Sequence, residues 1–126
     1  MTALESLERE RYVLLTTFRR DGRAVSTPVW AARDGDALVV WSVADAGKVK
    51  RLRHTSRVTV APCDVRGRPT AEPVPGRAVL LDAAGTDRVR AALARKYGLL
   101  GRLTLWGSRL RRGRDGTIGV RISLTS

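Results

Sequence analysis

The residues best suited to chemistry lie in one short segment, residues 42–53, with the sequence SVADAGKVKRLR. Four cations, Lys48, Lys50, Arg51 and Arg53, stand there within six positions. The residues before them favour a strand, so the cations belong to a helix that begins where this strand ends. The first turn of such a helix offers free backbone N–H groups and the positive end of its dipole, which together bind phosphate. The segment therefore predicts a phosphate-binding site at the start of a basic helix.

The orientation of the cations around this helix gives them different roles. Val49 and Leu52 define the buried side, and Lys48 and Arg53 flank it. We therefore expect Lys48 and Arg53 to be the main contacts of a phosphate that lies against the protein.

Three further residues extend the predicted site. Lys50 and Arg51 point further toward solvent, where they can meet a longer acidic tail. Ser42 ends the preceding strand, and its hydroxyl can donate to the phosphate. A solvated basic helix that binds nothing fits the same spacing, and the residues alone leave both interpretations open.

Residues 26–30, with the sequence STPVW, form an unusual strand upstream. Pro28 cannot donate to a sheet, so this strand is an edge, a bulge or the floor of a ligand site. Thr27 and Val29 alternate onto one face, and Pro28 and Trp30 onto the other. An ordinary edge strand would explain the pattern without a ligand.

Conventional catalytic groups are scarce in this chain. His54 is the one histidine and Cys63 the one cysteine, and no metal-ligand cluster, Ser-His-Asp set or glycine-rich phosphate loop can be assembled. We therefore predict no metal site and name no catalytic residue. This composition fits an enzyme whose cofactor carries the chemistry, and it fits a protein without enzymatic activity equally well.

The alternation of apolar and polar residues predicts a mainly β, antiparallel, six-stranded barrel with short inserted helices, in a single domain over residues 1–126. Two Asp-Gly turns, at residues 21–22 and 34–35, join the first three strands into a meander. The expected strands are 12–18, 24–32, 37–42, 57–63, 74–81 and 117–125. The expected helices are 3–10, 47–54 and one capped by Thr86 that ends near Gly98, followed by a second helical stretch up to residue 110.

The chain carries 24 Lys and Arg against 12 Asp and Glu, a net charge of +12 that favours an anionic partner. No apolar run is long enough to insert into a membrane. The acidic, polar N-terminal residues do not read as a signal peptide. With a single cysteine, these features predict a cytoplasmic protein.

Five segments together resemble the pyridoxamine 5′-phosphate oxidase-like split β-barrel group, and within it the actinobacterial branch of coenzyme F420-dependent oxidoreductases. They are residues 16–22, 26–30, 47–53, 60–69 and 97–98. The resemblance implies an FMN-binding split-barrel fold and a homodimer with the cofactor in a groove at the subunit interface.

The resemblance also assigns cofactor contacts. The ring would lie along Thr27, Pro28 and Val29. The phosphate would be held by Ser42, Lys48 and Arg53, with Arg51 as a further contact. Trp41 joins this set, and with residues 99–112 it is a candidate for the substrate pocket. The oligoglutamate tail of coenzyme F420 would suit the basic charge, with Lys50 and Arg51 at its rim.

The leading hypothesis is therefore an oxidoreductase that transfers hydride between coenzyme F420, a deazaflavin, and an unidentified small molecule. The same barrel using FMN is the nearest alternative. A carrier or sensor that binds the deazaflavin without turnover is another. A basic nucleic-acid-binding barrel is the alternative of a different class. Aromatic residues make up only 5% of the chain and none interleaves with the basic helix, so we expect no specific nucleic acid partner.

Overall fold

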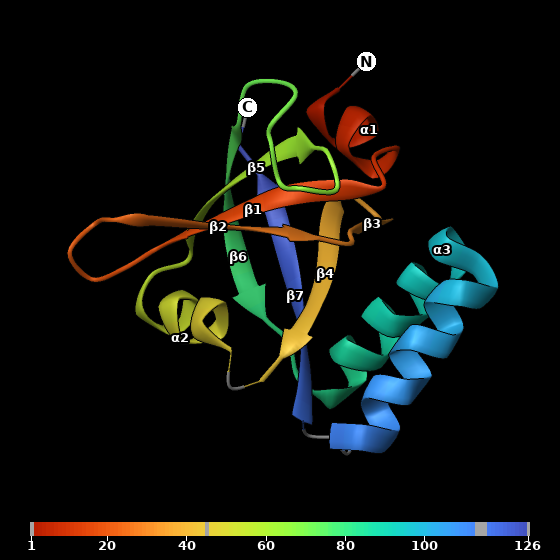
Figure 1. Ribbon diagram of the computed structural model, residues 1–126. Coiled ribbons are helices and arrows are strands. Elements are labelled where there is room, and N and C mark those ends of the chain that lie inside the picture. Colours follow the sequence, from red (N-terminus) through yellow and green to blue (C-terminus); the bar gives the residue numbers. More distant parts are fainter. Residues whose placement is uncertain (1, 45, 113–115, 126) are drawn as a thin grey trace.

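The protein is an antiparallel sheet curled into a half-barrel, with three helices packed against it (Figure 1). The computed structural model describes residues 2–44, 46–112 and 116–125, with side chains in all of these except 99–112. Its seven described strands follow the order β2-β1-β5-β6-β7-β4-β3. The strands are β1 (Tyr12–Phe18), β2 (Ala24–Val29), β3 (Ala32–Asp34), β4 (Ala37–Val43), β5 (Arg57–Cys63), β6 (Val74–Leu80) and β7 (Thr117–Leu124). The helices are α1 (Ala3–Glu8), α2 (Gly47–His54) and α3 (Ala83–Arg112).

The prediction of six strands and an initial three-stranded meander is wrong at one point. The expected strand 24–32 is divided at Trp30 and Ala31 into β2 and β3. β2 pairs with β1 and β3 pairs with β4, so the two halves lie at opposite edges of the sheet. The chain crosses between these edges within two residues, which requires the sheet to curl. The remaining predicted bounds agree with the structure to within two residues, apart from the start of α3.

Two side chains of α3 hold this crossing in place. The Tyr97 hydroxyl accepts a hydrogen bond from the backbone N–H of Ala31 at 3.2 Å, and the Trp30 and Tyr97 rings stack with centroids 4.4 Å apart. Lys96 Nζ donates to the carbonyl oxygens of Ala31 at 2.6 Å and Glu10 at 2.7 Å. The buried backbone groups of the crossing thus obtain partners that a sheet ladder would otherwise supply.

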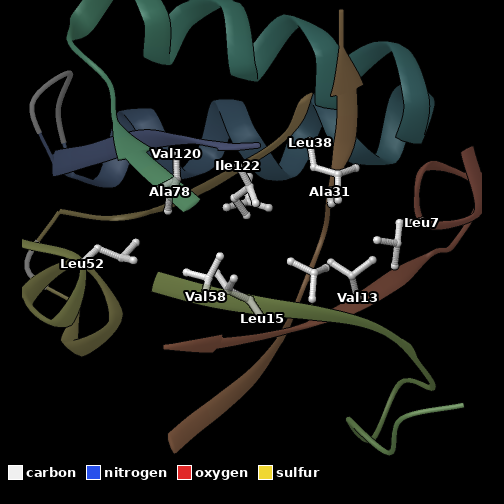
Figure 2. Packing of buried hydrophobic residues seen from close by; sticks show 12 residues of the cluster. Leu7, Val13, Leu15, Ala31, Leu38, Leu52, Val58, Ala78, Val120 and Ile122 are labelled. Carbon is white, nitrogen blue, oxygen red and sulfur yellow. The ribbon is translucent and has the colours of Figure 1, made fainter. Parts of the chain in front are cut away.

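The core lies inside the curled sheet, and two short helices close it (Figure 2). Leu15, Leu38 and Ile122 point inward from three different strands. Leu7 of α1 and Leu52 of α2 pack at opposite ends of this cluster. Because Leu52 anchors α2 by its apolar side, the basic side of this helix is left on the surface.

The helix α3 covers the outer face of β3, β4 and β7. It begins at Ala83, where the Asp82 carboxylate accepts a hydrogen bond from the Gly85 N–H at 2.8 Å, so Asp82 is the capping residue. The expected cap, Thr86, instead accepts from the Gly119 N–H of β7 at 2.8 Å. Gly98 divides α3 at a φ of 67°. The helix resumes after Gly98, as predicted, although the side chains of 99–112 lie outside the described residues.

Candidate functional site

An open groove of about 570 Å³ lies between the basic side of α2 and the turn that joins β1 and β2. Figure 1 shows α2 below this turn. The turn forms because Gly22 adopts a φ of 89° and the Asp21 carboxylate accepts from the Arg23 N–H at 3.0 Å. We call this cavity the α2–hairpin groove. Its lining residues are Phe18, Arg19, Arg20, Asp21, Arg23, Gly47, Lys50, Arg51 and His54.

The start of α2 is open to an anion. Among the described residues, no side chain forms a capping hydrogen bond at its N-cap residue, Ala46, and its first turn contains no acidic residue. The first N–H groups of a helix have no acceptor within the helix itself. Anions are stabilised at such an end by these donors and by the helix dipole.

Arg51 folds back toward this helix start. Its Nε donates to the Thr17 hydroxyl of β1 at 2.6 Å. Its Nη1 lies so close to Gly47 that a Cβ added there would be only 2.8 Å away. The guanidinium therefore sits beside the first residue of α2, one helical turn before its own backbone.

Lys48 is a second cation of α2, and its charge interacts with that of Arg51. Burial lowers the pKa of the Lys48 ammonium, and the charge of Arg51 lowers it further. The pKa of Arg51 is also lowered, first by burial and then by the nearby Arg19. Crowding of like charges costs free energy, and a bound anion would offset that cost and raise both pKa values.

The groove lacks matching negative charge. Within the described part of the chain, Asp21 is its one carboxylate, and it pairs with Arg23 at 2.8 Å. No described carboxylate forms an ion pair with Arg19, Arg20, Lys50 or Arg51. This imbalance is what an anion-binding surface requires.

Ser42 and Trp41, which we expected to contact the cofactor, lie on opposite faces of β4. Ser42 points inward and is buried, and its hydroxyl donates to the Val43 carbonyl at 3.2 Å. Trp41 points outward into the apolar cluster beneath α3, which includes Val89 and Leu93. Neither residue lines the α2–hairpin groove.

The residues expected to support a cofactor ring lie on β2, which is an edge strand of the sheet, as its proline suggests. Thr27 pairs with Leu15 and shares the inner face with Val29, which contacts the core. Pro28 is exposed on the outer face. The alternation predicted for these three residues is confirmed, but none of them lines the groove.

The two cations that we expected to hold one phosphate, Lys48 and Arg53, both lie outside the lining of the α2–hairpin groove. Arg53 lines a different cavity of about 210 Å³, together with Arg90, Asp82 and Asp87. Two carboxylates are thus already present beside it. We expected Arg51 to contact the acidic tail of a cofactor. Its guanidinium lies beside Gly47, the first residue of α2, instead.

The sequence matches one protein family over most of its length. Residues 2–109 match the family described as pyridoxamine 5′-phosphate oxidase. The chain belongs to this family. No curated protein matches the sequence significantly.

Solved structures agree with membership of the pyridoxamine 5′-phosphate oxidase family at the level of the fold. A conserved hypothetical protein of Mycobacterium tuberculosis has a TM-score of 0.75 at 20% identity, covering 100% of this chain and 82% of that one. A structure named F420 reductase has a TM-score of 0.63 at 17% identity, covering 100% and 96%. An FAD-binding protein of Mesorhizobium loti has a TM-score of 0.62 at 21% identity, covering 100% and 90%.

Several residues that line the groove, and Thr17, which contacts Arg51 from β1, were not predicted from the sequence. Thr17 lies on the same inward face of β1 as Val13 and Leu15. A polar residue at a position expected to be apolar was the one feature of the sequence that could have indicated its role. Gly47 precedes Arg51 by four positions, which places both on one side of the helix. The hairpin arginines carry no such signal, because exposed charges beside a turn are common.

The described residues of this pyridoxamine 5′-phosphate oxidase family member also bear on other kinds of site. They contain no group of three His, Cys, Asp or Glu side chains that could hold a metal ion. No helix among them is long and apolar enough to cross a membrane. The pKa of the buried Cys63 thiol is raised by burial, which keeps it protonated and unreactive. The charged side chains that line the α2–hairpin groove are mainly cations.

Proposed function

We propose that this protein binds a flavin-type redox cofactor, with the cofactor phosphate at the start of α2, and acts as an oxidoreductase. The supporting observation is the position of the Arg51 guanidinium beside the first residue of α2, where no described side chain forms a capping hydrogen bond. The Lys48 ammonium adds positive charge that acts on Arg51. Each supplies donors or positive charge, and no described carboxylate pairs with either side chain. The pyridoxamine 5′-phosphate oxidase family, to which the chain belongs, includes oxidoreductases.

The residues present fit a phosphorylated cofactor. The absence of a Cβ at Gly47 leaves room for the guanidinium beside the helix start, where a phosphate oxygen can accept from both. Once bound, the cofactor would supply the ring that accepts or donates hydride. The chain would hold the phosphate with Arg51 and Lys48 and orient the ring along Thr27, Pro28 and Val29. The substrate is a small molecule that the lining residues do not identify.

Coenzyme F420 is the cofactor that we favour, because its oligoglutamate tail adds carboxylates that the unpaired cations of the groove can meet. Lys50, Arg19 and Arg20 line the groove and are the cations that we expect to contact the tail. The structural similarity to an F420 reductase agrees with this choice, and the similarity to an FAD-binding protein keeps FMN as the alternative.

Titration of the protein with coenzyme F420 and FMN, side by side, tests this choice. We expect tighter binding of coenzyme F420 at low salt. The difference should shrink as salt rises, because exposed charges are screened beyond about 10 Å at 0.1 M. Lys50→Ala should reduce the affinity for coenzyme F420 and leave that for FMN unchanged. Equal affinities at low salt would favour FMN, and tight binding of an oligonucleotide alone would favour the nucleic-acid alternative.

We also propose that two copies of the chain associate and close the cofactor site between them. Val79 of β6 is 57% exposed on the face of the sheet opposite the core residue Ala78. In the proposed dimer this exposed apolar side chain lies in the contact between the two copies. Light scattering at micromolar concentration should give twice the mass of one chain. Val79→Arg should lower this mass, and a wild-type monomer would contradict the proposed dimer.

A further inference from the structure

We infer that Thr17 and Gly47 are positioning residues, which together hold the Arg51 guanidinium in the orientation that binds an anion. Neither residue is expected to touch the ligand through its own side chain. This inference rests on the proposed function, since it assigns a role within the same phosphate site.

Thr17 fixes the inner edge of the guanidinium. Its side chain is only 1% exposed and points inward from β1, among apolar neighbours. Its hydroxyl oxygen accepts from Arg51 Nε at 2.6 Å. This bond uses one of the five N–H donors of the guanidinium and leaves the terminal ones for a ligand.

Gly47 provides the space for the outer edge. A Cβ at this position would lie 2.8 Å from Nη1 and 3.7 Å from Cζ of Arg51. These are the atoms at the far end of a flexible side chain, so an added methyl group would displace the guanidinium rather than the helix. Glycine is otherwise a poor choice for the first position of a helix, because it costs conformational entropy there.

The physical benefit of this arrangement is preorganisation. A free arginine side chain loses rotamer entropy when it is immobilised. Contacts with Thr17 and Gly47 meet this cost during folding, before the ligand arrives. The terminal nitrogens of the Arg51 guanidinium then face the groove, where they can donate two parallel hydrogen bonds to a phosphate.

The test compares FMN with riboflavin, which has the same ring but no phosphate. Thr17→Val removes the hydroxyl and keeps the shape, and it should weaken FMN binding about tenfold, the effect of losing one bond to a charged group. Thr17→Ser should restore the affinity. Riboflavin binding should not change in either variant. Gly47→Ala should also weaken FMN binding while leaving thermal stability equal or higher.

A double-mutant cycle shows whether the effects pass through Arg51. In an Arg51→Ala background, Thr17→Val and Gly47→Ala should cause no further loss of FMN affinity. Equal loss of FMN and riboflavin in Thr17→Val would indicate a purely structural role and overturn the inference. Unchanged FMN affinity in both single variants would overturn it as well.

A separate probe keeps the two proposals distinguishable. Wild-type protein that binds FMN no better than riboflavin would contradict the phosphate site, and with it the proposed function. Inorganic pyrophosphate then tests the positioning residues alone. Its stabilisation of the wild type in thermal unfolding should be lost in Thr17→Val and Gly47→Ala and kept in Thr17→Ser. Loss in none of these variants would overturn the inference.

Discussion

Replacement of Arg51 by alanine is expected to weaken binding of the phosphorylated cofactor about a hundredfold. Two charge-assisted bonds to phosphate are lost, each worth roughly 1.5–3 kcal/mol, and about 1.4 kcal/mol corresponds to a tenfold change in Kd. Lys48→Ala should cause a smaller loss, about tenfold, because a single ammonium contributes fewer directed bonds. Both are measured by fluorescence titration with FMN or coenzyme F420.

Arg53→Ala is the matched control for Arg51→Ala. It removes the same charge from the same helix, two positions further on, but Arg53 lines a separate cavity. We expect a change of no more than about twofold, the scale of an exposed charge acting at a distance. A large loss in Arg53→Ala with normal binding in Arg51→Ala would instead support the assignment made from the helical wheel.

Gly119→Val is expected to be the most destabilising single substitution at the junction of α3 and β7, lowering the free energy of unfolding by roughly 2–3 kcal/mol. Even a Cβ at this position would lie 2.8 Å from Val89 Cγ2 and 3.0 Å from Thr86 Cα. The second of these atoms is backbone and cannot move aside alone. Urea unfolding measures the effect.

A second experiment tests whether the destabilisation comes from the contact with Val89 or would follow any substitution in β7. Gly119→Ala should destabilise less than Gly119→Val, because it adds a smaller group. Val89→Ala removes the nearest methyl group, so the double variant Gly119→Ala/Val89→Ala should be more stable than the sum of the single effects predicts. Strict additivity would show that the side chain of Val89 is not the obstacle.

The parts of the fold that were predictable are those set by local pattern. The bounds of β1, α2 and β5 follow from residue alternation, helical spacing and turn signals. The division of the strand at Ala31 was not predictable in this way. Residues 24–32 favour extended backbone throughout, and the break depends on partners such as Tyr97 that lie far away in sequence.

The candidate site was predictable to the level of the segment but not of the side chain. A helical wheel gives the direction in which a Cβ leaves the helix, and this placed Lys48 beside the ligand and Arg51 outside. Arginine has a long side chain, so its charged end can lie a full turn from that direction. The Thr17 hydroxyl draws Arg51 back, and this contact joins residues 34 positions apart in the sequence.

The place of β7 in the sheet has a consequence for how the chain is made in the cell. This strand comes last of those described, yet it lies between β6 and β4 and pairs with both. All the other described strands are therefore synthesised before the two halves of the sheet can join. Until then β4 and β6 each present an unpaired edge, which is a template for association with other chains. Synthesis of this protein thus includes a late interval of exposure to aggregation, which chaperones that shield strand edges would shorten.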